Sequence, residues 1–450
     1  MRSKKLLLCC LMNDGHREIL RIALPSIVSN ITVPLLGLID VAIVGHLGSA
    51  SYIGAIAVGG MLFNIIYWVF GFLRMGTGGM TSQAYGAGDA TETARLLMRS
   101  VSVGLLVAVT LIVLQHPIAG LAFALIDTTA DVERLASLYF HICIWGAPAV
   151  LGLYSFSGWF IGMQNSRYPM FIAIAQNVVN IAVSLLLVYG FGMKIEGIAI
   201  GTLAAQYAGL LMAVLLWRKR YVPGLPAIGR GALLHREAMI RFFRVNRDIF
   251  FRTLCLVAVT MYFTSAGAAQ GEVVLAVNTL LMQLFTLFSY FMDGFAYAGE
   301  ALTGKYIGAR QTEAMHRMMC RLFAWGISIA IAFTLLYAIG GETFLCLLTD
   351  EQRVIEASAV YFPWAVAIPL TGIWAFLLDG IFIGATATSL MLRSMVVATA
   401  GFFFTYFSFR TACGNHALWL AFLVYLSLRG IVQGFLGRRL LSRNPVGEKH

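Results

Sequence analysis

The chain has 450 residues, of which 59% are hydrophobic and only 12% are charged. This number of charged side chains is too small for the polar surface of a soluble globular protein. The composition therefore indicates an integral membrane protein. The formal net charge of +11 does not call for a nucleic-acid partner, because basic residues of polytopic membrane proteins gather in cytoplasmic loops. The seven cysteines include no C-x-x-C pair, so neither a disulfide framework nor a zinc site is indicated.

Apolar segments long enough to cross the roughly 30 Å of bilayer hydrocarbon recur along the whole chain. Charged or turn-rich breaks divide them into about twelve expected helices. The predicted spans are residues 17–45, 52–82, 93–115, 132–158, 168–190, 196–217, 246–268, 272–303, 314–340, 353–380, 388–410 and 416–437. The pattern therefore predicts an all-α polytopic membrane protein.

The longest hydrophilic segment covers residues 218–245 and is rich in arginine and glycine. It separates the sixth predicted span from the seventh. We therefore expect an N-terminal lobe at 17–217 and a C-terminal lobe at 246–437, each with six helices, between polar tails at 1–16 and 438–450.

Lysine and arginine side chains gather in every second connection between the predicted spans. Examples are Arg95, Arg167, Lys305, Arg393 and Arg438, whereas the intervening connections carry mostly acidic residues. Basic residues mark the cytoplasmic side of membrane proteins. We expect both termini and the interlobe linker to be cytoplasmic, in a bacterial inner membrane.

Two segments of the chain resemble each other. GMTSQAYGAGDATETARLLMR (79–99) aligns without gaps with ALTGKYIGARQTEAMHRMMCR (301–321), and both follow the second span of their lobe. Because both copies are expected to face the cytoplasm, the two lobes are predicted to be parallel repeats, an arrangement found in transporters. Two such lobes without a soluble domain favour transport over catalysis.

The stretch LLGLIDVAIVGHLG (35–48) places Asp40 inside the first predicted span. A charge at the bilayer centre costs several kcal/mol, so an aspartate there is usually paired, protonated or exposed to water, and often marks an ion pathway. Asn177, Asn180 and Ser184 share one face of the fifth span, and Thr202 and Gln206 share a face of the sixth. We expect Asp40 to be an ion-coupling group; the alternative is a structural partner for an asparagine or a neighbouring backbone.

Pro25 and Pro34 lie on the same predicted helix as Asp40. Each removes a backbone N–H and leaves a carbonyl without its helical partner, so we expect kinks in this span. A gating role and a plain packing role remain equally open, because proline kinks are common in membrane helices.

Three long strings carry a family resemblance. The segments IGAIAVGGMLFNIIYWVFGFLRMGTGGMTSQAYGAGD (53–89), YFMDGFAYAGEALTGKYIGA (290–309) and LLDGIFIGAT (377–386) resemble the multidrug and toxic compound extrusion (MATE) transporters, in their DinF-like branch. The likeness covers nearly the whole chain.

The resemblance implies two six-helix lobes around a V-shaped cavity, and export of organic cations or amphiphiles driven by inward flow of protons or sodium ions. It also implies one polar pocket formed by Asp40, Asn180 and Thr202. Ser184 departs from the family pattern, since many relatives carry an acid there. We expect a monomer that uses no cofactor beyond the ion gradient.

Acidic residues also occur in the predicted C-terminal lobe. Asp293 and Glu300 are seven residues apart on the eighth span, and Asp379 lies in the tenth. They could attract cationic substrates, or they could be tied by Arg74, Lys305 or Arg393 into ion pairs that brace the lobes, and the sequence favours neither reading.

The predicted coupling ion is the proton, with sodium as the alternative. Sodium prefers several oxygen ligands that include fixed negative charge, and the serine at position 184 leaves Asp40 as the sole carboxylate of the expected pocket. A lone buried aspartate with amide and hydroxyl neighbours is better suited to binding a proton.

Two further functions stay open. A flippase for a lipid-linked saccharide would be expected to carry cationic residues in mid-span, whereas the mid-span charges here are mainly acids. A membrane-embedded enzyme or receptor is the alternative of another class, although no G-x-S-x-G elbow and no H-E-x-x-H motif is present. We predict that the chain is not an enzyme.

Overall fold

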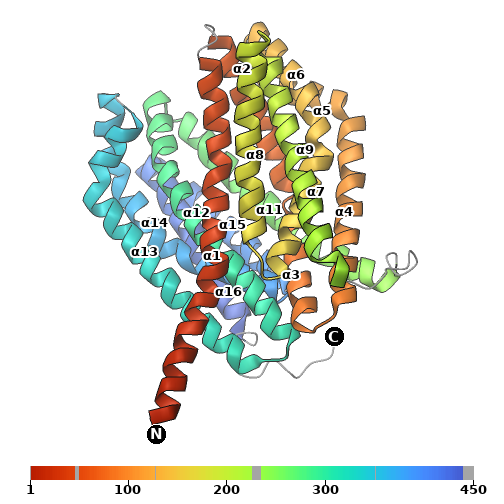
Figure 1. Ribbon diagram of the computed structural model, residues 1–450. Coiled ribbons are helices and arrows are strands. Elements are labelled where there is room, and N and C mark those ends of the chain that lie inside the picture. Colours follow the sequence, from red (N-terminus) through yellow and green to blue (C-terminus); the bar gives the residue numbers. More distant parts are fainter. Residues whose placement is uncertain (1, 46–49, 127, 225–234, 350, 439–450) are drawn as a thin grey trace. The chain divides into compact units, whose positions relative to one another are not determined.

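The computed structural model describes residues 2–45, 50–126, 128–224, 235–349 and 351–438. Within these ranges all regular structure is helical and no residue lies in a strand, which confirms the predicted fold class (Figure 1). Backbone contacts divide the chain into two compact units. One contains residues Val28–Asn246, and the other contains Met1–Ile27 together with Arg247–His450.

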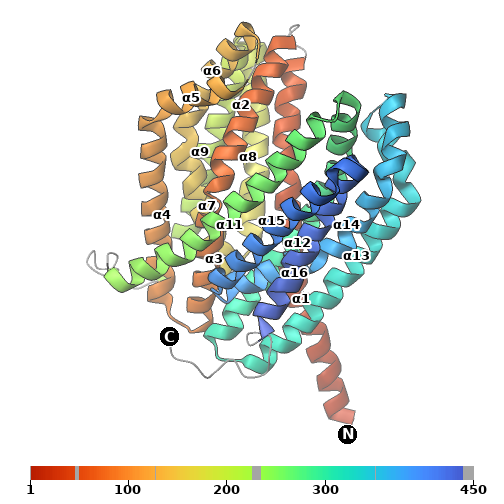
Figure 2. The same cartoon turned by 180° about the vertical axis from the view of Figure 1, so that it is seen from behind.

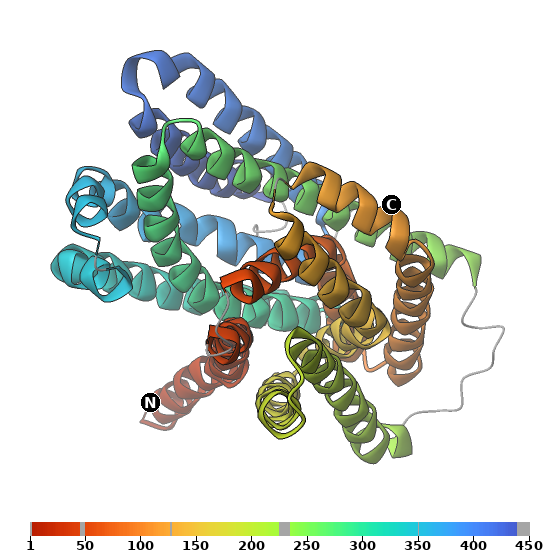
Figure 3. The ribbon, with the colours of Figure 1, turned by 90° about the horizontal axis from the view of Figure 1, so that it is seen from above.

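The unit Val28–Asn246 begins with the second part of α1 and ends with the first turns of α11. Its α8 and α9 lie side by side, as seen from above in Figure 3. Its helices are α1 (Arg2–Gly45, from Val28 on), α2 (Ala50–Val69), α3 (Phe72–Gly86), α4 (Ala90–Val113), α5 (Gln115–Leu125), α6 (Ala130–Cys143), η1 (Ile144–Gly146), α7 (Ala147–Gly162), α8 (Arg167–Leu185), η2 (Leu186–Gly190), α9 (Ile195–Arg220) and η3 (Val222–Gly224).

The second unit combines the first part of α1 with most of α11 and all later helices. α12 packs along α14, and α15 packs along α16, which Figure 2 shows from behind. Its helices are α11 (Arg236–Ala268), α12 (Glu272–Gly308), α13 (Thr312–Leu348), α14 (Gln352–Gly384), α15 (Thr388–Cys413) and α16 (Asn415–Leu436).

Eleven helical segments among the residues searched are long and apolar enough to cross a membrane. They run from Ser51–Gly86 to Asn415–Leu436 and correspond one by one to the predicted spans from 52–82 onward. α1 contains the remaining prediction, 17–45.

Three boundaries differ from the sequence expectation. α1 is already helical from Arg2, so the described part of the expected tail at 1–16 continues the first helix. The connection after the third span holds a short helix, α5, which the hydropathy pattern did not separate. α11 begins at Arg236, inside the expected linker, since its polar first turns are still good helix formers.

The boundary between the two units within α1 also differs from the predicted lobes. The first unit begins at Val28, within α1, so the residues of α1 up to Ile27 group with the C-terminal helices. Pro25 and Pro34 lie on opposite sides of this boundary, and α1 is helical through both.

The internal repeat extends into the packing of each unit. Gly158 of α7 lies against α3, where an added Cβ would stand 2.1 Å from the Arg74 carbonyl oxygen. Gly380 of α14 lies against α12, where an added Cβ would stand 2.1 Å from the Ala296 carbonyl oxygen. Gly380 follows Gly158, and Ala296 follows Arg74, by the same number of residues that separates segment 301–321 from segment 79–99. In both units only glycine lets the two backbones approach this closely.

The turns between helices repeat in the same way. α3 and α12 both end in a glycine followed by an alanine cap, Ala87 and Ala309. The residues that directly follow these caps, Gly88 and Arg310, have φ angles of 73° and 57°. The repeated sequence therefore specifies the same helix ending in both units.

Candidate functional site

Asp40 lies in α1 and is buried, with 3% of its surface exposed. The Thr202 hydroxyl of α9 donates a hydrogen bond of 3.4 Å to Asp40 Oδ2. Asn180 of α8 in turn donates through Nδ2 to Thr202 Oγ1 over 3.1 Å. The structure therefore brings together the three residues that the family pattern suggested, on three helices of one unit.

Several oxygen atoms of this cluster have no hydrogen-bond partner among the described residues. They are Asp40 Oδ1, Asn180 Oδ1 and Ser184 Oγ, all of them buried. A buried acceptor without a donor costs free energy. The cluster therefore retains capacity to bind a proton, a water molecule or a cation.

Asn177 and Gln206 have separate surroundings. Asn177 Nδ2 donates to the backbone carbonyl of Thr32 over 2.8 Å and so ties α8 to the turn of α1 that precedes Pro34. Gln206 packs against the junction before α7, where a Cβ at Gly146 would lie 1.7 Å from Gln206 Oε1. Asn177 therefore positions α1, and Gln206 packs on Gly146, so neither side chain is hydrogen-bonded to Asp40 in the part of the chain that the structure describes.

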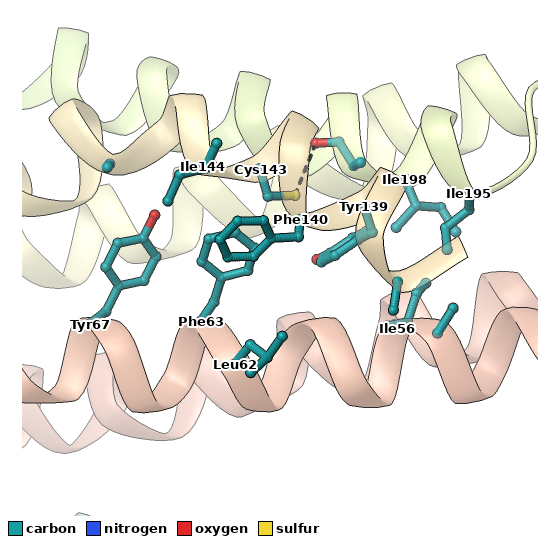
Figure 4. Close-up of a cluster of buried hydrophobic side chains, with 14 of the residues drawn as sticks. Ile56, Leu62, Phe63, Tyr67, Tyr139, Phe140, Cys143, Ile144, Ile195 and Ile198 are labelled. Carbon is teal, nitrogen blue, oxygen red and sulfur yellow. Dashed lines mark hydrogen bonds between the residues drawn. The ribbon is translucent and has the colours of Figure 1, made fainter. Parts of the chain in front are cut away.

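Two neighbours of the cluster were missed by the sequence analysis. Tyr139 and Cys143 of α6 lie close enough to Asp40 for electrostatic interaction, and Tyr139 also lies near Thr202. Both belong to a packed hydrophobic cluster with Phe63 of α2, shown in Figure 4, in which Cys143 Sγ donates to the Ala199 carbonyl over 3.7 Å. In sequence they look like ordinary core residues, and only the three-dimensional contact reveals them.

Asp379 of α14 occupies a different setting, inside the second unit. It forms ion pairs with Arg252 of α11 and Arg429 of α16, and it accepts a hydrogen bond from Gln433. All four side chains are buried. The partners of Asp379 are thus not Arg74, Lys305 or Arg393. Arg252 and Arg429 lie within spans, so two of the mid-span charges are cations beside the more numerous acids.

The other predicted residues of this unit are placed as follows. Asp293 lies close enough to Arg429 to interact with it electrostatically. Glu300 is 1% exposed, in the stretch of α12 that packs on α14. Lys305 pairs with Glu18 of α1, whose carboxylate also accepts a hydrogen bond of 2.6 Å from the Tyr306 hydroxyl.

The part of the chain that the structure describes contains no group of three or more His, Cys, Asp and Glu side chains that could hold a metal ion. The chemistry of the Asp40 cluster is therefore that of one carboxylate surrounded by hydroxyl and amide groups.

Comparison with known proteins identifies relatives of the whole chain. The MatE family model matches residues 25–186 and 249–407. DNA damage-inducible protein F of Escherichia coli (strain K12) is 38% identical over 97% of this chain and 95% of its own length. The probable multidrug resistance protein NorM of Rhizobium meliloti (strain 1021) is 24% identical, over 95% of this chain and 94% of its own.

Solved structures share the fold. A MATE crystal structure in the bent conformation has a TM-score of 0.83 at 18% identity, and it covers 95% of this chain and 96% of its own. The outward-facing conformation of a multidrug resistance MATE family transporter of the MOP superfamily has a TM-score of 0.85 at 19% identity, with the same coverage. The chain therefore belongs to the MATE family of membrane transporters, in the branch that contains DNA damage-inducible protein F.

Proposed function

We propose that this transporter exports cationic or amphiphilic small molecules in exchange for protons, and that Asp40 binds the proton. The observation that carries the proposal is a buried carboxylate in a membrane-spanning helix with only neutral hydrogen-bonding neighbours. An uncompensated charge in such surroundings is costly, and either a proton or a cationic substrate removes the cost. One carboxylate cannot bind a proton and neutralise a cationic substrate at the same time. Proton binding therefore favours release of the substrate, and substrate binding favours release of the proton.

The hydrogen-bond pattern of the cluster supports proton binding. Asp40 Oδ1 and Asn180 Oδ1 are both acceptors without a donor. A proton on Asp40 turns one acceptor into a donor, so the protonated cluster can satisfy more of its buried polar atoms. A sodium ion would instead need several oxygen ligands with fixed negative charge, and among the described residues Asp40 is the sole carboxylate of the cluster.

α1 offers a route from proton binding to movement. Its second part contacts α8 and α9 through Thr32 and Asp40, whereas its first part is held to α12 by Glu18. Pro25 and Pro34 flank the boundary between the units, and a helix bends most easily where prolines remove backbone hydrogen bonds. Protonation of Asp40 would thus change the contacts of one end of a helix that belongs to both units.

The energy available per proton is sufficient for useful export. A membrane potential of 100 mV contributes about 2.3 kcal/mol per charge, and one pH unit contributes about 1.4 kcal/mol. Together they support a substrate gradient of several hundredfold, provided that the substrate's own charge does not move.

We further propose that the working unit is a monomer in the bacterial inner membrane with cytoplasmic termini. The Asp40 cluster is complete within one unit of one chain. The alternative of a lipid-linked saccharide flippase gains buried cations in Arg252 and Arg429, but Asp379 already engages both of them. They are therefore poorly placed to receive a pyrophosphate.

Replacement of Asp40 by asparagine tests the proposal. D40N keeps the shape of the side chain and removes its titration, so we expect efflux of a cationic dye from cells to fall to the vector background. D40E should retain part of the activity, and D131N, which alters an exposed acid at the start of α6, should retain all of it. Undiminished efflux by a membrane-inserted D40N protein would contradict the role of Asp40.

A further inference from the structure

A cavity of about 520 Å³, whose lining does not include Asp40, Asn180 or Thr202, lies in the unit Val28–Asn246. It is formed by the first turn of α2, by α6 between Arg134 and His141, and by the start of α9. The three helices begin the spans Ser51–Gly86, Ala130–Gly162 and Ile195–Gly224, which follow one, three and five earlier crossings when α1 is counted as the first. All three therefore begin at the same membrane face, which the basic-residue pattern assigns to the outside.

The lining of this cavity carries charges of both signs. Arg134 and Lys194 supply two cations, and Glu196 supplies a carboxylate. Within the described ranges none of these three side chains takes part in an ion pair. The Lys194 ammonium lies 5.7 Å from the centre of the Tyr52 ring, a cation–π contact that holds it at the cavity.

The remaining walls are apolar or already engaged. Leu135 and Leu138 of α6 line the cavity, and Leu138 is 38% exposed. His141 also lines it, but its Nδ1 lies 2.8 Å from the Ser137 carbonyl and its Nε2 lies 3.3 Å from His116 Nδ1. Both of its ring nitrogens therefore have partners inside the protein.

We infer that this cavity binds the headgroup of a zwitterionic phospholipid with a primary ammonium, that is, an ethanolamine headgroup of the outer leaflet. Arg134 and Lys194 match the phosphate, Glu196 matches the ammonium, and the leucines match the beginning of an acyl chain. Basic pockets between membrane helices bind the phosphates of anionic lipid headgroups, and Glu196 adds a partner for an ammonium to such a pocket here. Aromatic residues such as Tyr52 are typical of the headgroup level.

The chemistry predicts an order of preference among lipids. A choline headgroup has the same phosphate and the same net charge, but its quaternary ammonium cannot donate a hydrogen bond to Glu196. A glycerol headgroup carries the phosphate without any cation, so Glu196 would be left next to a net negative ligand. Ethanolamine lipid should therefore bind more tightly than either.

Native mass spectrometry of the full chain, titrated in detergent with each of three palmitoyl-oleoyl phospholipids, tests the inference. The wild type should bind phosphatidylethanolamine more tightly than phosphatidylcholine or phosphatidylglycerol. R134Q/K194Q should weaken that binding by about thirtyfold, since each basic residue near a membrane surface contributes roughly fivefold. E196Q should keep the phosphate interaction but abolish the preference for ethanolamine over choline.

The matched control is R353Q/R410Q, which removes two exposed arginines near the same predicted membrane face, one at the start of α14 and one at the end of α15. It should leave the affinity unchanged. Equal affinity of the wild type for all three lipids would overturn the inference, as would an equal loss in the control. Competition by glycerophosphoethanolamine as strong as by the whole lipid would show that the ligand is a soluble headgroup compound instead.

Discussion

Thr202 connects Asp40 with Asn180 inside the unit Val28–Asn246. Its hydroxyl donates to Asp40 and accepts from Asn180. A donor directed at a carboxylate stabilises the charged form relative to the protonated form. Thr202 therefore influences the pH at which Asp40 exchanges its proton, although it does not titrate itself.

Replacement of Thr202 by valine should move the pH dependence of transport upward. The variant loses the hydroxyl that stabilises ionised Asp40, so the carboxyl group keeps its proton to higher pH. A hydrogen bond to a charged group is worth about 1.5 kcal/mol or somewhat more, and the 3.4 Å contact is long, so the shift should be about one pH unit or less. Efflux measured in vesicles from pH 6 to 9 gives the midpoint, and T202S is the control that should retain the wild-type profile. An unshifted T202V midpoint would mean that the hydroxyl does not act on Asp40.

At this scale the sequence predicted well the residues that are unusual in a membrane helix. Asp40, Asn180 and Thr202 stand out because polar groups are rare in apolar spans, and helical spacing placed them on defined faces. Tyr139 and Cys143 could not be found, because aromatic and cysteine side chains are common in cores of any kind. Arg252 and Arg429 were overlooked because their pairing with Asp379 joins three helices that are far apart in the sequence.

Among the helices, α14 shows how a buried charge cluster joins neighbouring elements. Asp379 of α14 is held by Arg252 of α11 and by Arg429 of α16. Removing one partner of a buried ion pair leaves the other charges without compensation and typically costs 3–5 kcal/mol. The cluster is thus a structural feature that should tolerate substitution poorly.

D379N should therefore lower the thermal stability of the purified protein strongly and reduce its yield. The matched control is E313Q, because Glu313 forms an ion pair with Arg317 one turn away on α13, and both side chains are mostly exposed. An exposed pair of this kind contributes at most about 1 kcal/mol, so E313Q should melt close to the wild type. Fluorescence-detected size exclusion after heating measures both variants. Equal melting temperatures for D379N and E313Q would show that the cluster does not brace the unit.

Helix identity was easier to predict than helix boundaries. Apolar length identified the helices from α2 to α16 that are long enough to cross the bilayer, because hydrocarbon requires continuous apolar segments. The short α5 escaped notice, since eleven residues are too few to span a bilayer. The early start of α11 escaped for a different reason: hydropathy marks where a helix enters the hydrocarbon, and the polar first turns of α11 lie before that point.

The whole molecule is built from one structural plan used twice. Gly158 and Gly380, at the same offset as the repeated segments, allow matching close approaches of two helices in each unit. The sequence repeat was visible at 79–99 and 301–321, but the glycine contacts required coordinates, since glycine alone is not diagnostic in membrane helices. Both repeated segments follow the second span of their half of the chain, so both are expected on the same side of the membrane. Knowing the side of one connection between spans therefore fixes the side of all the others.

A topology measurement tests that orientation. A reporter that is active only in the cytoplasm, fused after Arg220, should be active, and the same reporter inserted after Thr349 should be silent. The reason is the concentration of arginine and lysine in every second connection, which membrane insertion retains on the cytoplasmic side. The opposite pair of results would place the termini outside and would remove the basis for assigning the lipid cavity to the outer leaflet.

The central claim is that protons acting through Asp40 drive export. Its most direct test uses purified protein in sodium-free proteoliposomes, with an imposed pH gradient and ethidium as the cationic substrate. We expect wild-type transport that stops when a protonophore is added, and no gradient-driven transport by D40N in vesicles with equal protein content. Transport that instead requires an imposed sodium gradient, and that continues at full rate in the presence of the protonophore, would contradict the account.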